Sequence, residues 1–443
     1  MGATSPESSA SHAEPGTVGR FSRSPAWLFA LIFLLSFAVR ASLLVSWADA
    51  RKDFYRLHGE TGRVTLSLLR SGQFADPYMI PTGPTAHPTP DGPGILALIY
   101  YTFGITATAG YVRGLVAIST YSTLFALLTW FGRRLGLGTR AGVLAGVAGA
   151  LFPQQGLDEV IGQGVSARAA IALGLLIVAF LHRWTTGRGS AAGSVLLGMG
   201  CGAAFHVSPP LLLVVLGYLT FEAWWTKGRR KWLLCACVVV GAALACVPWA
   251  LRNYTALHEF LFVRSNFGLE LRIANKDGAD ADIEVTLARL ATLRHPSENI
   301  EEARLVRDLG EAEYMRRARN EALRWIRTHP SEFLRLTLLR FVHFWCGPLR
   351  FPWLAALFTT VTVLVLLALR RILPVLTIPG RAALLIPLAT FPLVYYVVSY
   401  VAHYPAPLAW LLQLLAGYEV QSWIGRGNDR RGASTPLNHP RVL

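Results

Sequence analysis

The sequence predicts an all-α polytopic membrane protein with about ten transmembrane helices, interfacial helices and two large extracytoplasmic loops. Of its 443 residues, 53% are hydrophobic and only 15% are charged, which is less charge than a soluble domain carries. Several nearly uncharged runs are long enough to cross the hydrocarbon core of a bilayer. These runs are continuous and do not alternate, so they predict helices, which satisfy their own backbone hydrogen bonds within lipid.

The apolar runs divide the chain into five parts. Residues 1–25 are polar and are predicted to form a disordered cytoplasmic tail, and residues 26–250 form a membrane domain. Residues 351–421 are predicted as C-terminal membrane helices and 422–443 as a basic cytoplasmic tail, with an extracytoplasmic segment between the two membrane parts. The predicted spans are 26–47, 110–131, 141–155, 166–184, 191–206, 208–225, 232–250, 351–369, 383–402 and 405–421.

The basic residues predict how the spans are oriented. The formal net charge is +16, and the Lys and Arg residues gather in short connections such as 227–231 and 370–381. With ten spans, all these clusters fall on one side, which the positive-inside rule identifies as the cytoplasm. Both termini are then cytoplasmic. The same scatter of charge between apolar runs argues against a nucleic-acid partner.

Two long segments remain outside the cytoplasm: the first outer loop, 48–109, and the segment 251–350, which is helical in pattern. Two apolar pieces within them, 94–104 and 333–345, are too short or too charged to span the membrane. We expect these pieces to lie in the outer interface, with re-entrant hairpins as the alternative. Long loops on a rigid scaffold usually carry function, so the site is expected here.

Glu60, in the first outer loop, is the leading candidate for chemistry. It stands at the start of a predicted short helix that ends at Gly72, and helical spacing places Glu60, Arg63 and Ser67 along one face. A carboxylate beside a cation, partly dried by lipid, could accept a proton from an incoming hydroxyl. The alternative is a charge that is simply favoured by the dipole at the start of a helix.

Other familiar sites are absent from the sequence. The five cysteines are an odd number without a CxxC pair, which gives no sign of a disulfide framework or a zinc site. There is also no phosphate-binding glycine loop, no GxSxG and no cluster with metal-ligand spacing. The absence of a nucleotide-binding motif fits a substrate that arrives through the membrane.

Four phrases of the sequence carry a family resemblance. They are GETGRVTLSLLRSGQFADPY, PTGPTAHPTPDGPGILALIYYTFG, VPWALRNYTALHEFLFVRSNFGLELRIANKDGA and EYMRRARNEALRWIRTHPSEFLRLTLLRFVHFW. Together they cover residues 50–105 and 247–346 and resemble bacterial membrane glycosyltransferases of the GT-C superfamily. The nearest group is similar to glycosyltransferase family 39, which is related to protein O-mannosyltransferases and aminoarabinose transferases.

The resemblance implies a GT-C fold in the bacterial inner (plasma) membrane. It also implies a hexosyl- or pentosyltransferase that moves a sugar from a polyprenyl-phosphate donor. The acceptor would be a hydroxyl of a glycan, lipid or protein on the extracytoplasmic face. In this family an acidic residue of the first outer loop serves as base or as metal ligand, and Glu60 occupies the matching place. A divalent metal is the one cofactor considered, and none is certain.

The leaving group of such a reaction is a phosphate, so the site needs cations where negative charge develops. Arg252 and Arg264 are candidates because either could fork onto phosphate oxygens, although arginines at span ends also anchor to lipid headgroups. Asn266 and Glu270 could bind hydroxyls of the sugar or the acceptor. His87 stands among four prolines in a rigid segment and is expected to line the cleft.

The C-terminal part departs from the family pattern. Related proteins usually carry an arginine-containing stretch before the final helix, where this chain has His403 and Tyr404. These two side chains remain candidates for holding the donor. The missing cation favours one alternative function, a catalytically silent GT-C relative that binds lipid-linked sugar.

A second alternative is a flippase or transporter for a lipid-linked glycan. Such proteins carry buried charges near the membrane midplane, and Arg40 and Arg168 are the clearest charges within or near the predicted spans. No acidic partner for either is evident in the sequence, and Arg40 is expected to snorkel toward the interface.

Three further polar residues in the next outer loop could shape the cleft that His87 is expected to line: Asp158, Glu159 and Gln163.

Overall fold

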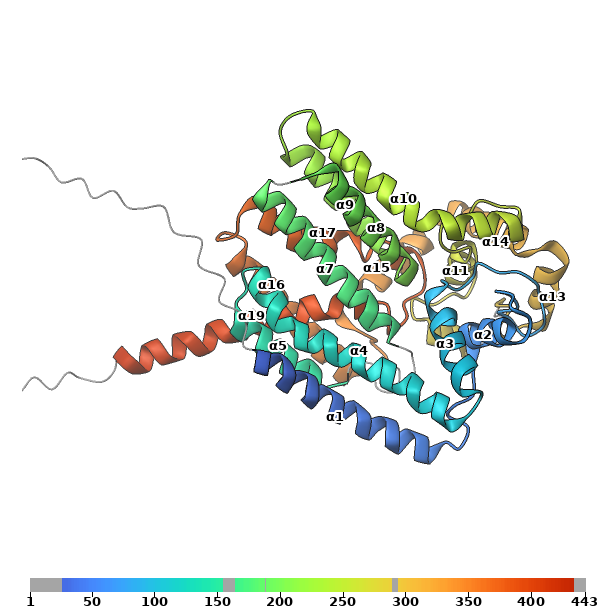
Figure 1. The fold of residues 1–443 in the computed structure, drawn as a ribbon, viewed down its shortest axis with the longest axis horizontal. Coiled ribbons are helices and arrows are strands. Elements are labelled where there is room, and N and C mark those ends of the chain that lie inside the picture. The colour runs from blue at the N-terminus through green and yellow to red at the C-terminus, as the bar shows by residue number, and fades with distance from the viewer. Residues whose placement is uncertain (1–25, 154–163, 188, 289–293, 434–443) are drawn as a thin grey trace, which may run out of the picture.

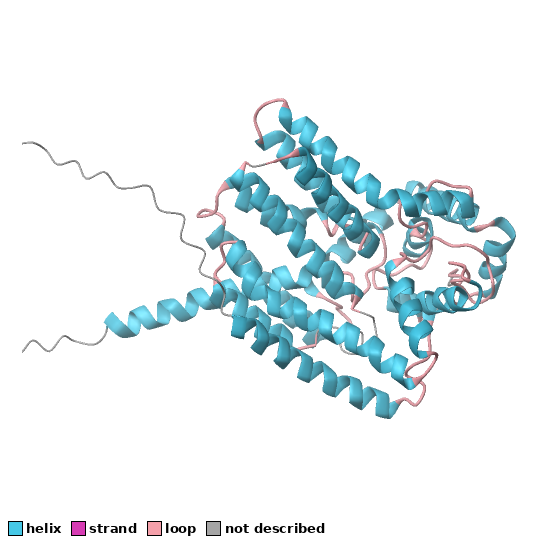
Figure 2. Ribbon diagram, in the orientation of Figure 1, coloured by secondary structure: helices cyan, strands magenta, loops and turns pink. Residues whose placement is uncertain are grey.

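The computed structural model describes residues 26–153, 164–187, 189–288 and 294–433. Over these ranges the chain is built from helices joined by loops, with two isolated β-bridges and no β-strand (Figures 1 and 2). The helices of the membrane bundle are α1 (Ala26–Ala50), α4 (Ala107–Arg134), α5 (Thr139–Leu151), α7 (Val165–Thr186), α8 (Ala191–Val207), α9 (Leu211–Trp225), α10 (Arg230–Leu257), α16 (Pro352–Ile372), α17 (Ile378–Thr390), α18 (Leu393–Val397) and α19 (Ala406–Ala433).

The outer helices are α2 (Gly59–Ser71), α3 (Asp91–Phe103), α11 (Phe267–Ala274), α12 (Ile283–Leu287), α13 (Ile300–Leu309), α14 (Glu311–Thr328) and α15 (Pro330–Cys346). Five of them (α2, α3, α11, α13 and α14) form a lobe at one end of the bundle, at the right of Figure 1. We call this the outer lobe. It is built from the two long segments that the sequence placed outside the cytoplasm.

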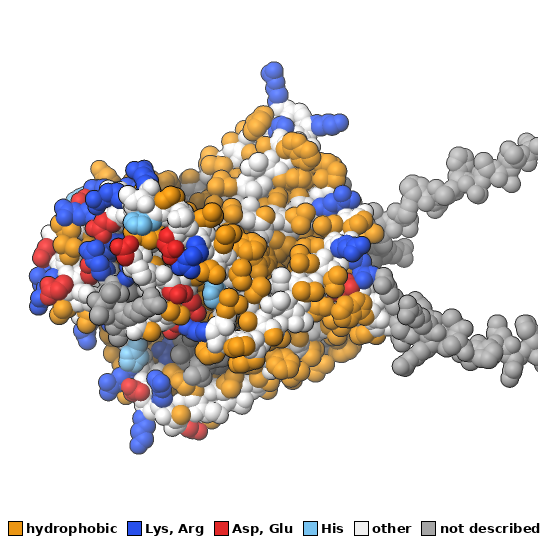
Figure 3. All heavy atoms as spheres, turned by 180° about the vertical axis from the view of Figure 1, so that it is seen from behind, with side chains coloured by type: hydrophobic (Ala, Val, Ile, Leu, Met, Phe, Trp, Pro, Cys, Tyr) orange, Lys and Arg blue, Asp and Glu red, His pale blue; other side chains and the backbone are white. Residues whose placement is uncertain are grey.

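Six stretches are long and apolar enough to cross a membrane: α1, α4, α7, α10, α16 and the stretch Ile378–Val397. Helices α5, α8 and α9 are apolar but shorter. The chain is therefore a multi-pass membrane protein. Figure 3 agrees, because hydrophobic side chains cover the bundle while acidic and basic side chains gather over the outer lobe, and Lys and Arg side chains lie at the opposite end.

Several predicted spans have different ends in the structure; α10, for example, continues to Leu257, seven residues beyond the predicted end. The span predicted at 383–402 lies at Ile378–Val397, because Thr377 accepts a hydrogen bond from the Gly380 N–H and caps the helix earlier. This span is divided into α17 and α18 just before Pro392, which is a common site for a break. The span predicted at 405–421 continues as α19 to Ala433.

Small residues let two membrane helices pack closely. Helix α8 lies against α10, and a Cβ atom at Gly198 would stand 2.0 Å from the carbonyl oxygen of Val238. At Gly241 a Cβ atom would stand 2.1 Å from the oxygen of Val195. Glycine is therefore required on both sides of this contact, as is common between membrane helices. The pair α8–α10 forms one wall of the cavity described below.

Two arginines that suggested a transporter have structural roles. Arg40 does not snorkel: it is fully buried, and its guanidinium donates to the carbonyl oxygens of Gly149 (2.9 Å) and Ala150 (3.0 Å) at the end of α5. Arg168 has an acidic partner after all, since its Nη2 lies 3.0 Å from Oδ2 of Asp91 on α3. Both side chains fasten helices to one another.

The two apolar pieces expected in the outer interface are both helical. The piece at 94–104 lies within α3, and the piece at 333–345 lies within α15. On α15 the two arginines differ: Arg335 is exposed and pairs with Glu332, whereas Arg340 is buried and donates to Oδ1 of Asn275 at 3.2 Å. Arg340 thereby joins α15 to the end of α11.

Candidate active site

Helix α2 presents Glu60 in its first turn. The helix ends where the sequence predicted, because Gly72 adopts the left-handed conformation at φ 69° and its N–H donates to the Leu68 carbonyl. Arg63 lies one turn after Glu60 and donates to the carbonyl oxygen of Pro77 at 3.3 Å. Arg63 therefore fastens α2 to the loop that follows it, and its guanidinium is directed to Pro77.

The Glu60 carboxylate is held by three side chains from distant parts of the chain. Its Oε2 lies 2.7 Å from Nε2 of His87, and its Oε1 accepts a hydrogen bond of 2.7 Å from the Ser297 hydroxyl. Nε2 of His295 lies 3.5 Å from Oε1. Behind them, the Tyr78 hydroxyl lies 2.9 Å from Nδ1 of His87. Glu60 retains 26% exposure of its side chain, while His87 is 1% exposed.

These contacts make Glu60 and His87 an ion pair. Burial raises the pKa of Glu60, but the charge and hydrogen bond of His87, together with His295 and Ser297, outweigh this and hold the pKa below its ordinary value. Burial lowers the pKa of His87, but the charge and hydrogen bond of Glu60 leave that pKa above its ordinary value of 6.5. Glu60 is therefore held as a carboxylate, with part of its side chain exposed.

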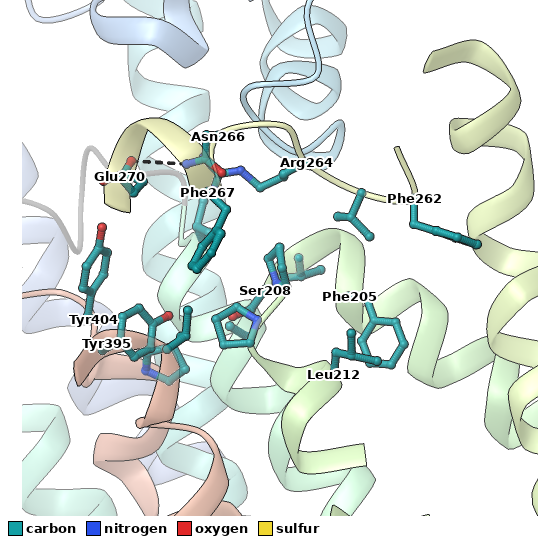
Figure 4. Close-up of a pocket in the computed structure, with 18 of the residues that line it drawn as sticks. Phe205, Ser208, Leu212, Phe262, Arg264, Asn266, Phe267, Glu270, Tyr395 and Tyr404 are labelled. Atoms are coloured by element: carbon teal, nitrogen blue, oxygen red, sulfur yellow. Dashed lines mark hydrogen bonds between the residues drawn. The ribbon is translucent and has the colours of Figure 1, made fainter. Parts of the chain in front are cut away.

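A cavity of about 710 Å³ lies beside this pair, between the outer lobe and the membrane bundle. At its outer rim are five residues that the sequence singled out: Arg264, Asn266, Glu270, His403 and Tyr404. Figure 4 shows Arg264, Asn266 and Glu270 along the top of the view and Tyr404 and Tyr395 below Glu270. The Asn266 amide donates to Oε1 of Glu270 at 3.2 Å.

The remaining walls of the cavity are apolar and come from membrane helices. Phe205 of α8, Leu212 of α9 and Val239 of α10 line it, and Phe262 stands beside them on the connection to α11. Cys246 of α10 also faces this space. A polar rim above an apolar shaft suits an amphipathic molecule with a charged head and a hydrocarbon tail.

The cavity and the Glu60–His87 pair are joined through Arg264. Nε of Arg264 donates to the carbonyl oxygen of His87 at 2.7 Å, while the same side chain lines the cavity. Glu60 itself is not a lining residue of the cavity. The two parts are thus adjacent, with His87 between them: its backbone faces the arginine and its ring faces the carboxylate.

Arg252 does not line the cavity. Its guanidinium donates to the carbonyl oxygens of Thr85 (2.6 Å) and Phe74 (2.5 Å) and lies over the rings of Phe74 and Trp249. These contacts fix the first outer loop against the end of α10. The structure thus separates the two arginines that the sequence proposed together.

Several residues of the site were not found by sequence reasoning. Tyr78, His295 and Ser297 complete the surroundings of Glu60, and Glu311 binds the backbone just before His87. Tyr78 ends the first family phrase but was not singled out, and the other three lie outside the four phrases. Asp158, Glu159 and Gln163, which were expected to shape the cleft, lie outside the described residues.

The surroundings of Glu60 do not fit a divalent cation. Both carboxylate oxygens already accept hydrogen bonds, from His87 and Ser297. Across the described ranges, no group of three or more His, Cys, Asp or Glu side chains is arranged to hold a metal ion.

Fold and cavity together define a multi-pass α-helical membrane protein with an amphipathic pocket under an extramembrane lobe. No protein-family model and no curated protein matches the chain. The apo oligosaccharyltransferase of Archaeoglobus fulgidus is 15% identical, with a TM-score of 0.55 over 94% of this chain and 52% of that chain. The same archaeal enzyme, AglB, in complex with an inhibitory peptide and a dolichol-phosphate, is 14% identical, with a TM-score of 0.52 and the same coverage.

A third structure, ArnT from Cupriavidus metallidurans bound to undecaprenyl phosphate, is 14% identical and covers 94% of this chain and 81% of that chain. Its TM-score of 0.37 is too low for a comparison of folds. At such identities the likeness to the archaeal enzyme defines the fold alone. The chain has the GT-C fold that the resemblance predicted, and it spans about half the length of the archaeal oligosaccharyltransferase chains, 52%.

Proposed function

We propose that this protein is a membrane glycosyltransferase that moves a sugar from a polyprenyl-phosphate donor to an acceptor hydroxyl on the extracytoplasmic face. The observation that carries the proposal is the amphipathic cavity, whose rim residue Arg264 is bonded to the backbone of His87. His87 in turn holds the Glu60 carboxylate at 2.7 Å. A donor site and a base thus lie next to each other at the outer end of the membrane bundle.

In this proposal the donor's hydrocarbon tail lies along the apolar walls of α8, α9 and α10. The phosphate lies at the rim, where Arg264 donates to its oxygens and stabilises the charge that develops on departure. His403 and Tyr404 also line the cavity and are proposed to hold the phosphate or sugar. Asn266 and Glu270 are proposed to bind sugar hydroxyls.

The proposed reaction is a single displacement. Glu60 takes the proton of the acceptor hydroxyl, and the oxygen forms a bond to the anomeric carbon of the sugar. The bond between that carbon and the phosphate oxygen breaks, and its electron pair stays on the phosphate. The products are the glycosylated acceptor and polyprenyl phosphate, and the proton on Glu60 passes to water.

Purified protein in lipid nanodiscs, supplied with labelled polyprenyl-phosphate sugars and with glycan, lipid or peptide acceptors, tests this function. Wild type should transfer label, and Glu60→Gln should transfer it on the order of 10²- to 10⁴-fold more slowly, the usual contribution of a general base. Glu298→Gln, at an exposed carboxylate near Ser297, is the matched control and should retain activity. Equal transfer by wild type and Glu60→Gln would remove the proposed role of Glu60.

The membrane and its sidedness belong to the same proposal. We propose that the protein lies in the bacterial inner membrane with both termini in the cytoplasm and the outer lobe on the other side. The Lys and Arg side chains at the end opposite the outer lobe support this orientation (Figure 3).

If the purified protein bound polyprenyl-phosphate sugar without turnover, the alternative of a catalytically silent relative would replace the transferase.

A further inference from the structure

The segment Thr85–Ala86–His87 is held more completely than an ordinary loop. Its three side chains are 0%, 0% and 1% exposed. Each of its backbone N–H and C=O groups has a partner: Thr85 N donates to Phe74 O, Thr85 O accepts from Arg252, and Ala86 N donates to Glu311. Ala86 O accepts from Ser265 N, His87 N donates to the Thr85 hydroxyl, and His87 O accepts from Arg264.

One buried carboxylate organises these contacts. Glu311 is 3% exposed and stands in the first turn of α14, where the helix dipole favours negative charge. Its Oε1 accepts from Ala86 N at 2.8 Å and from the Ser265 hydroxyl at 2.7 Å, and its Oε2 accepts from the Thr85 hydroxyl. Glu311 therefore binds the residues directly before His87 and directly after Arg264.

The direction of these hydrogen bonds requires a carboxylate. The Thr85 hydroxyl accepts from the His87 N–H at 2.9 Å, so its own hydrogen is free to go to Glu311. Every contact of Glu311 thus comes from a donor. A glutamine keeps a single acceptor oxygen. With its NH₂ group toward the Ala86 N–H it sets a donor against a donor, and with its NH₂ group toward the Thr85 hydroxyl it leaves the hydrogen of that hydroxyl without its acceptor.

We propose that Glu311 is a positioning residue that holds His87 and Arg264 in one fixed arrangement. Because His87 contacts Glu60 and Arg264 lines the cavity, Glu311 thereby fixes the position of the base Glu60 relative to the phosphate of the donor. This role rests on the proposed function, because it assigns Glu311 to the same reaction. Glu311 acts through the backbone of 85–87 and through Ser265. Its carboxylate is directed to Thr85, Ala86 and Ser265, and it does not line the cavity.

Glu311→Gln tests the role, with Glu302→Gln as the matched control. Glu302 is a buried carboxylate of the same lobe, 7% exposed, whose partners Arg272, Arg294 and Tyr314 lie apart from 85–87. Transfer assays should show kcat reduced about 10- to 100-fold in Glu311→Gln, as expected for a misplaced reacting group. In Glu302→Gln, kcat per folded protein should stay within about threefold of wild type, even if its Tm falls.

A second pair of variants covers the case in which Glu311→Gln does not fold. Thr85→Ser keeps the hydroxyl that links the His87 N–H to Glu311, and Thr85→Val removes it. Transfer should survive in Thr85→Ser and fall about tenfold or more in Thr85→Val, on the same physical ground. Equal rates in these two variants, or equal losses in Glu311→Gln and Glu302→Gln, would overturn the role of Glu311.

A measurement without turnover separates this inference from the proposed function. Glu60, Glu311 and Arg264 act on the charge of His87, and Tyr78 and His295 stand against its ring. Because Glu311 raises the pKa of His87, Glu311→Gln should lower the His87 midpoint in NMR titrations of histidine-labelled protein, and Glu302→Gln should leave it in place. An unchanged midpoint in Glu311→Gln overturns the inference, whereas absence of transfer by wild type overturns the function.

Discussion

Arg252 and Arg264 lie only twelve residues apart, but one faces the cavity and the other holds a loop in place. Arg264 lines the cavity and bonds to His87, while Arg252 donates to two backbone carbonyls and lies over two aromatic rings. The number of hydrogen bonds that each guanidinium makes to its own protein distinguishes them. A side chain that holds a loop is less able to release its donors to a ligand.

This difference predicts two separate effects of substitution. Arg252→Ala leaves the Phe74 and Thr85 carbonyls without their charged donor and should lower the free energy of unfolding by about 2 kcal/mol. Arg264→Gln should change stability less and raise the donor KM about tenfold, because it removes a cation from the cavity rim. Thermal melting and donor titrations of the two variants check this. A larger KM effect in Arg252→Ala than in Arg264→Gln would contradict it.

The ion pair of Glu60 and His87 predicts the pH dependence of transfer. A general base must be ionised, and His87 holds the pKa of Glu60 below its ordinary value of 4.5. The acid limb of kcat attributable to Glu60 should therefore lie below that pH in wild type. His87→Gln removes the charge, so the pKa of Glu60 rises and the acid limb should move to higher pH. A pH–rate profile with its acid limb unchanged in His87→Gln would contradict this assignment.

At the scale of elements, most helices could be predicted because lipid imposes a simple rule. A run of apolar residues as long as the bilayer is thick must form a helix, and α1, α4, α7, α10 and α16 lie where such runs occur. The ends at Ile378 and Ala433 were missed because local capping and continued helix formation outside the apolar run decide them.

The candidate residues fall both inside and outside the family phrases: Arg252 lies in a phrase and does not line the cavity, whereas His403 and Tyr404 lie outside the phrases and line it. Glu60 on α2 and the rim residues Arg264, Asn266 and Glu270 are all in such phrases, and the structure brings the last three together around one cavity. Of the residues around Glu60, the sequence singled out only His87. Tyr78, His295 and Ser297 reach the carboxylate or its histidine only through the folding of two long loops, which no helical period describes.

The close contact of α8 with α10 gives a prediction at the same scale. Gly198→Val would drive a side chain against the Val238 carbonyl, since even a Cβ atom would lie 2.0 Å away. Overpacking of this kind costs about 1–3 kcal/mol or separates the helices, and it should also distort the cavity wall. Gly200→Ala is the control on the same helix, because nothing lies within 4 Å of its Cβ position. Equal melting temperatures for the two variants would contradict this packing.

For the whole molecule, the arrangement of charge predicts sidedness. Exposed positions at the two ends, Ser71 at the end of α2 and Lys227 after α9, should lie on opposite sides of the membrane. In a cysteine-free background, Ser71→Cys should react with a membrane-impermeant maleimide in intact cells. Lys227→Cys should react only after the membrane is opened. Labelling of both positions from the same side would contradict the proposed orientation.

A transporter is a less fitting description of the whole molecule than a transferase. The buried charges on which it would depend are engaged in joining helices: Arg40 to the end of α5 and Arg168 to Asp91. The rim of the cavity, at the junction with the outer lobe, carries five polar side chains that a ligand would meet: Arg264, Asn266, Glu270, His403 and Tyr404. Such a one-sided gathering suits a reaction at the membrane surface.

The central claim is that a lipid phosphate occupies this cavity with its head at Arg264, and photocrosslinking in nanodiscs tests it most directly. A polyprenyl phosphate with a photoreactive group in its first isoprene units would be activated, and the adducts mapped by mass spectrometry. If the lipid phosphate lies in this cavity, adducts should form on Phe205, Leu212 and Val239 and should be lost in Arg264→Gln. Adducts spread over exposed lipid-facing residues of α16, such as Leu366, and unchanged by Arg264→Gln, would contradict it.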